Sequence, residues 1–174
     1  MIDQIKENLW SQFGASVDSL EKAITLCPEN ILVENKRLFY MTYHILVFLD
    51  YYVTIPPENF SPKLPYTITD PENLPENAID DLVPNRFYTK TELLDYLQSS
   101  REKCRNLIAG LTEEKIKNER FVEDFESDAM NYSILEILLY NMRHVQHHAA
   151  QLNMILRQEI NDAPKWVFRA KEYN

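Results

Sequence analysis

The histidines of this chain are concentrated at two places. Three of the four, His144, His147 and His148, lie in one apolar stretch, and His44 lies in the only other comparably apolar run. On a helix, His144 and His148 fall one turn apart on the same apolar face. Two imidazoles in that arrangement can hold one metal ion from a single helix. The neutral imidazole of His44, brought in from the second run, would complete a three-histidine metal site.

Each of these polar residues also has a simpler interpretation. A histidine on an apolar face is more often a hydrogen-bonded core residue than a metal ligand. His147 lies about 100° from His148 on the helix and is expected at the edge of the stripe, although an i,i+3 pair with His144 is an alternative. Asn141 and Gln151 lie on or near the same face. They could orient a histidine ring or a ligand, or they could be ordinary polar residues.

Four helices are expected to position these side chains. Residues 133–157 contain no Gly or Pro, and Ser133 with Glu136 fits a capping box at their start. The other helices are expected at 2–26, which Pro28 ends, at 34–53, which carries His44, and from a capping box at Thr89 and Glu92 to a C-cap at Gly110. The fold class is therefore all-α, a four-helix bundle with a long proline-rich crossover between the second and third helices.

The connections are expected to be largely irregular. The crossover, about residues 54–88, holds seven of the nine prolines. We expect at most a short helix there, at 77–82, and a role either as a surface strap or as a cover that shapes a substrate pocket. One or two further helical turns are expected at 112–118 and irregular chain from there to Tyr132. The tail from Asn161, with Trp166 and Phe168, is expected to pack back onto the helices.

Composition restricts the class of protein. A chain of 174 residues suits one domain, 1–174, and a net charge of −9 disfavours nucleic acid and anionic membrane surfaces as partners. No apolar run approaches the roughly 20 residues of a membrane span, and the acidic opening stretch is not a signal peptide. The two cysteines, Cys27 and Cys104, make no disulfide framework. We therefore expect a cytoplasmic protein in a reducing compartment.

Several familiar active sites are disfavoured by the sequence. Val145 follows His144, so the glutamate of the H-E-x-x-H metalloprotease motif is missing. The Glu-x-x-His pairs of di-iron bundles are also missing. The two glycines are isolated, and we find neither a G-x-S-x-G elbow nor a phosphate-binding loop.

Several segments together resemble the DinB/YfiT family of metalloenzymes. They are His44 in the second helix, L-D-Y-Y at 49–52, Y-T-K-T-E-L-L-D-Y-L at 88–97, N-M-R-H-V-Q-H-H-A-A-Q-L-N at 141–153 and A-P-K-W-V at 163–167. The resemblance implies a four-helix bundle whose divalent metal is held by His44, His144 and His148, with His147 as a non-ligand neighbour. Zinc or nickel is the expected ion, with iron or manganese as alternatives.

The resemblance also indicates a class of reaction. Some members of the family resemble thiol S-transferases that use a low-molecular-weight thiol, including mycothiol-dependent maleylpyruvate isomerases and bacillithiol transferases. Our first hypothesis is therefore a metal-dependent transferase that activates a thiol or another small molecule. The alternatives are a metal-dependent hydrolase and a non-catalytic bundle that binds a ligand or a partner helix. A homodimer is expected from the apolar breadth of the second and fourth helices. Leu135, Leu139 and Met142, roughly opposite the histidine stripe, also need cover.

Overall fold

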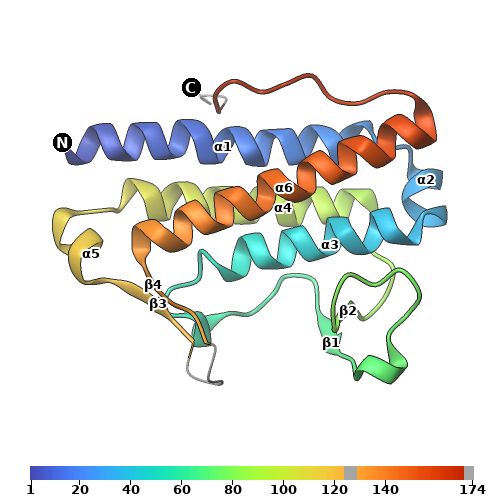
Figure 1. Cartoon of the computed structure of the whole chain (residues 1–174), viewed down its shortest axis with the longest axis horizontal. Coiled ribbons are helices and arrows are strands. Elements are labelled where there is room, and N and C mark those ends of the chain that lie inside the picture. The colour runs from blue at the N-terminus through green and yellow to red at the C-terminus, as the bar shows by residue number, and fades with distance from the viewer. Residues whose placement is uncertain (124–128, 171–174) are drawn as a thin grey trace.

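The computed structural model describes residues 1–123 and 129–170, and this part of the chain is mostly helical (Figure 1). Two short helices and two single 3-10 turns, η1 (Pro57–Asn59) and η2 (Pro71–Asn73), accompany the long helices. The predicted helices are confirmed to within a few residues. The long helices are α1 (Ile2–Leu26), α3 (Lys36–Tyr51), α4 (Lys90–Ala109) and α6 (Ile134–Ile160), and the short ones are α2 (Glu29–Glu34) and α5 (Glu113–Asn118).

The helix ends follow the capping residues. At the start of α4, the backbone N–H of Thr89 donates to the Glu92 carboxylate at 2.8 Å, and the Thr89 hydroxyl accepts from the Glu92 N–H. Ser133 accepts from the Glu136 N–H at the start of α6, without the reciprocal bond. Asn35 caps α3 by accepting from the Leu38 N–H at 3.0 Å, which explains why α3 begins later than predicted.

The four long helices pack in a ring in which α1 contacts α4 and α6, and α3 contacts the same two helices. Figure 1 shows α1 and α6 running in one direction and α3 and α4 in the other. Because α3 and α4 are consecutive long helices with the same direction, the chain must return along the length of the molecule before α4 begins. That return is the proline-rich connection between Tyr51 and Lys90.

The connection contains a small antiparallel sheet and is anchored by two tyrosines. Strand β1 (Tyr66–Ile68) pairs with β2 (Leu82–Pro84). The hydroxyl of Tyr43 donates to the carbonyl of Leu64, and that of Tyr88 donates to the carbonyl of Pro65, both at 2.6 Å. At 77–82, where the sequence allowed at most a short helix, no helix forms. Asn77 there has a φ of 71°, a left-handed conformation that does not propagate a helix.

A second two-stranded antiparallel sheet lies before α6, where irregular chain was expected. Strand β3 (Arg120–Val122) pairs antiparallel with β4 (Asn131–Ser133). Phe121 is fully buried there and packs its ring against Tyr51 and Tyr52 of α3. The prediction was wrong because strands of three residues are too short to show the period-two alternation that identifies a strand.

The tail returns along α1, as expected, but not through its two large aromatic residues. The Ala170 N–H donates to the carbonyl of Ser11 at 2.9 Å, and Val167 is buried (Figure 1). Trp166 and Phe168 are 65% and 80% exposed. A Cβ at Gly14 would lie 2.5 Å from the Ala170 Cβ, so this contact requires a glycine in α1.

The described helices fall short of the length and apolarity that crossing a bilayer requires. Cys27 and Cys104 are both buried and free.

Candidate metal centre

The structure brings together the three histidines that the sequence singled out as metal ligands. His44 comes from α3, and His144 and His148 come from successive turns of α6. One ring nitrogen from each lies within 4.8 Å of the other two. The Nε2 atoms of His44 and His144 are 3.1 Å apart. All three side chains are partly buried, so the cluster lies at the edge of the α3–α6 contact rather than deep in the core.

Two of the rings are oriented by acceptors on their outer nitrogen. Nδ1 of His44 lies 2.7 Å from the Asp80 carboxylate, and Nδ1 of His148 lies 2.6 Å from Oε1 of Gln151. A carboxylate or amide oxygen accepts hydrogen bonds, so each of these Nδ1 atoms carries the proton. Nε2 of His44 and of His148 is then left with a lone pair, which is the form that binds a metal.

The third ring fits a metal site better than a hydrogen-bonded core. Nδ1 of His144 is buried and has no hydrogen-bond partner among the described residues. Its Nε2 faces the lone pair of His44 at 3.1 Å, and two nitrogen lone pairs that close repel each other unless a proton or a cation lies between them. Three imidazole nitrogens are a suitable donor set for zinc, nickel or iron. The residues present therefore fit a divalent metal ion.

The electrostatics keep two of the imidazoles unprotonated. Burial, together with the smaller effect of the neighbouring histidines, lowers the pKa of His144 to about 3. Burial also lowers the pKa of His148 to about 4, against the opposing effect of the bond to Gln151. Both rings are neutral at pH 7 without a metal, so binding a metal there displaces no proton from them.

Aromatic rings surround the cluster on its inner side. The ring of Phe48 lies 4.7 Å from that of His44 and 5.8 Å from that of His144, between centroids, and Tyr52 lies 6.0 Å from His144. These rings exclude water from one side of the histidines. His147 is exposed, with its ring 5.0 Å from that of His148, and does not belong to the three-histidine group.

The sequence left two interpretations open for Gln151 and Asn141, and it did not single out a third residue, Asp80. Gln151 does bind a histidine ring. Asn141 instead donates to the Leu49 carbonyl at 3.0 Å and joins α6 to the backbone of α3. Asp80 was missed because it lies in the crossover, 36 residues from His44, where helical periodicity says nothing. The only signal was the Asp-Asp pair at 80–81 in a segment otherwise rich in proline.

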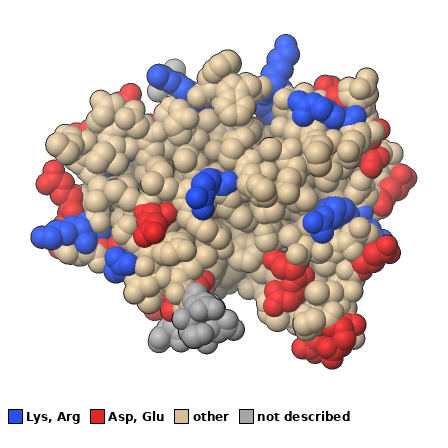
Figure 2. Space-filling view, viewed as in Figure 1, with Lys and Arg blue, Asp and Glu red and all other residues tan. Residues whose placement is uncertain are grey.

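The crossover gives this part of the molecule a negative potential. Residues 54–88 carry six acidic and two basic side chains. Figure 2 shows acidic groups gathered at the lower right, over the end of the molecule where η2 (Pro71–Asn73) lies. Such a field attracts cations towards the cluster and repels anions.

Comparison with known proteins yields one match. A family model described as the DinB superfamily matches residues 38–152, two thirds of the chain, including most of both helices that carry the histidines. No curated protein and no solved structure matches.

Proposed function

We propose, because the chain belongs to the DinB superfamily, that it is a metal-dependent enzyme whose divalent ion is held by His44, His144 and His148. The observation that carries the proposal is the convergence of the three ring nitrogens within 4.8 Å. We propose zinc or nickel as the ion. The four long helices with their crossover would then be a four-helix bundle of the family's type, and residues 1–174 would be one domain.

The histidines and their neighbours have separate roles in this proposal. Three protein ligands leave at least one coordination position open for a reactant. A metal ion held there would lower the pKa of a thiol or water in that position and so supply a nucleophile near neutral pH. Asp80 and Gln151 hold the proton of His44 and of His148 on Nδ1 and so keep each Nε2 directed inward. Phe48 keeps water from the inner side of the cluster.

We propose that the reaction is transfer of a small thiol to an electrophile. The histidine motif contains no glutamate that could act as a general base, because Val145 occupies the position after His144. A thiol needs only to lose its proton to become a strong nucleophile, so it makes the least demand on a separate base. Turnover that depends on an added low-molecular-weight thiol supports the proposal. Equal turnover without thiol would instead identify a hydrolase.

Metal content tests the site directly. Protein purified without a nickel column is expected to contain about one divalent ion per chain by elemental analysis. His144→Ala is expected to lose the ion, whereas His147→Ala, an exposed histidine three residues along the same helix, is expected to keep it. A wild-type protein that cannot be loaded with any divalent metal would contradict the proposal.

We propose further that the protein forms a homodimer through the outer side of α6. Leu139 there is 51% exposed, and Leu135 and Met142 on the same side are only partly buried. Light scattering would show a mass near twice 20.6 kDa. Leu139→Glu should lower the measured mass to that of the monomer. A monomeric wild type would refute the proposed dimer.

A further inference from the structure

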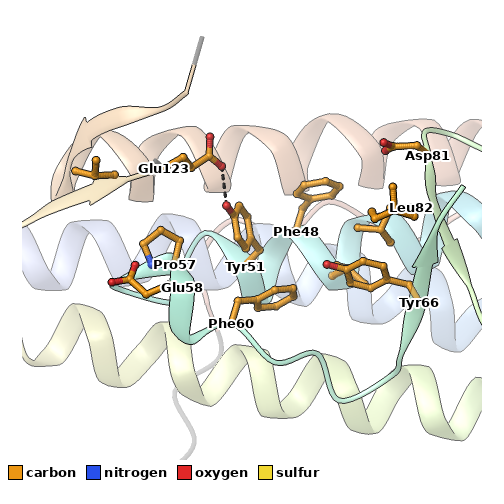
Figure 3. A pocket seen from close by; sticks show the side chains of 12 residues that line it. Phe48, Tyr51, Pro57, Glu58, Phe60, Tyr66, Asp81, Leu82 and Glu123 are labelled. Atoms are coloured by element: carbon orange, nitrogen blue, oxygen red, sulfur yellow. Dashed lines mark hydrogen bonds between the residues drawn. The ribbon is translucent and has the colours of Figure 1, made fainter. Parts of the chain in front are cut away.

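A cavity of about 700 Å³ lies next to the histidine cluster. Figure 3 shows it between α3, the crossover and the β3–β4 hairpin. Phe48 connects the two places, because its ring lines the cavity and also contacts the rings of His44 and His144. The volume is within the range of pockets that take a small organic molecule and much larger than a single metal ion needs.

The walls of this cavity are aromatic rings set at steep angles to one another. The rings of Phe48 and Tyr51 meet at 85° with centroids 6.2 Å apart, and those of Tyr51 and Phe60 meet at 75° and 5.1 Å. Tyr66 adds a fourth ring (Figure 3). Rings at such angles can present electron-rich faces from more than one side, an arrangement that attracts ammonium groups.

The charged groups of the cavity all have the same sign. Its described lining includes Glu58, Asp81 and Glu123 and no Lys, Arg or His.

The three carboxylates differ in how far the protein already satisfies them. Glu123 accepts from the Tyr51 hydroxyl at 2.7 Å and from the Met130 N–H at 3.0 Å. Among the described residues, the side chains of Glu58 and Asp81 have neither a hydrogen bond nor an ion pair, and both are exposed. The protein therefore leaves negative charge beside the aromatic walls without providing a cation to match it.

We infer that this cavity binds a small organic cation with an ammonium group. The ammonium would lie against the rings of Phe48, Tyr51 and Phe60, with Glu58 and Asp81 supplying the opposite charge. The assignment of this ligand as the enzyme's substrate rests on the proposed function. Binding of the cation does not, because a quaternary ammonium has no lone pair and cannot ligate a metal. Anionic ligands, including thiols that carry several carboxylates, are disfavoured in this cavity.

A matched pair of probes separates charge from shape. Choline and 3,3-dimethylbutan-1-ol differ only in the replacement of the ammonium nitrogen by carbon. Each is titrated into metal-free and metal-loaded protein at low ionic strength, followed by calorimetry or by the methyl resonances of the probe. We expect choline to bind at least about tenfold more tightly than its isostere, with or without metal. Equal affinity for the two probes would overturn the inference.

Two pairs of variants locate the binding. Glu58→Gln combined with Asp81→Asn, and separately Phe60→Leu, are expected to weaken choline binding at least about threefold. Their matched controls are Glu113→Gln combined with Glu114→Gln on α5, and Phe168→Leu on the exposed tail, which are expected to leave it unchanged. Equal losses in cavity and control variants would place the cation elsewhere and overturn the inference. Choline binding by a protein that takes up no metal would refute the proposed function alone.

Discussion

Helix α3 carries one polar cluster towards α4 and another towards α6, and the two clusters are built differently. On the α4 side, Asp50 accepts from the Lys103 ammonium at 2.6 Å and from the Tyr96 hydroxyl at 2.9 Å. Lys103 also donates to the Thr54 hydroxyl. A negative group thus meets a positive group, and donors meet acceptors. That cluster is complete without any further component.

The α6 side brings together three groups of the same kind. His44, His144 and His148 are all bases, and the hydrogen bonds to Asp80 and Gln151 are made by outer nitrogens only. Among the described residues, no Lys or Arg side chain donates a hydrogen bond to these three rings. Self-complementary polar groups stabilise a fold, whereas a cluster that lacks its complement indicates a ligand.

The strongest test of this contrast is metal removal. Chelation is expected to lower the melting temperature of the wild type by roughly 5–10 °C, because a ligand at 100 times its Kd contributes about 2.7 kcal/mol of stability. His148→Ala should show no metal-dependent change. Calorimetry with and without chelator measures both. A melting temperature that does not respond to chelator in a metal-loaded wild type would show that the two clusters do not differ in this way.

Breaking the α4-side cluster is expected to have the next largest effect. Asp50→Ala leaves the Lys103 ammonium and the Tyr96 hydroxyl without their partner. We expect a loss of about 2 kcal/mol in the free energy of unfolding, less than for a fully buried pair because Lys103 is partly exposed. Denaturant unfolding measures it, with Asp95→Ala on the exposed side of α4 as control. The loss should be equal with and without metal, and a metal-dependent loss would couple the two clusters.

Asp80 offers a finer test of the α6-side cluster, because it orients His44 without being a proposed metal ligand. Asp80→Asn is expected to lower metal affinity about tenfold, because the charged acceptor that fixes the His44 tautomer is lost. Competition with a chromophoric chelator measures the change. Asp81→Asn, one residue further on, should leave metal affinity unchanged. Equal effects of the two variants would mean that only the net charge of the crossover matters.

The smallest effect is a pH dependence of the metal-free protein. Unfolding returns His144 and His148 from a pKa of about 3 and about 4 towards the ordinary 6.5. As the pH falls through about 6.5, the unfolded state binds protons that the folded state does not. The contribution of these histidines to stability is therefore complete well above pH 6.5 and is lost progressively as the pH is lowered. Between about pH 7.5 and about pH 6 the change involves less than one proton per imidazole.

Carboxylates also titrate on acidification, so the contribution of the two histidines is obtained by comparing the wild type with a variant that lacks both. Melting temperatures of metal-free wild type and of His144→Gln combined with His148→Gln are compared over the same pH range. The wild type should lose more stability than the double variant. Parallel curves would show that the two imidazoles titrate alike in the folded and unfolded states.

Local patterns were enough to find the helices and the histidine pair of α6. Capping residues such as Thr89 and Ser133 mark helix starts within one or two residues, and the i,i+4 spacing of His144 and His148 fixes their common face. That His44 would meet them was a hypothesis from the concentration of histidines in two apolar runs, and the resemblance strengthened it, since nothing in α3 alone specifies its partner helix. Asp80 could not be anticipated, because its position depends on the pairing of β1 with β2 and on how the crossover is tied to the helices.

The distance along the chain between the parts of the cluster has a consequence for biosynthesis. His44 and His144 are separated by 100 residues, and α6 is made after all the other described helices. A growing chain therefore exposes a single histidine for most of its synthesis, and one imidazole retains a divalent ion poorly. The proposed metal ion can therefore be captured only after α6 has docked, and a retained ion would indicate that α6 is in place.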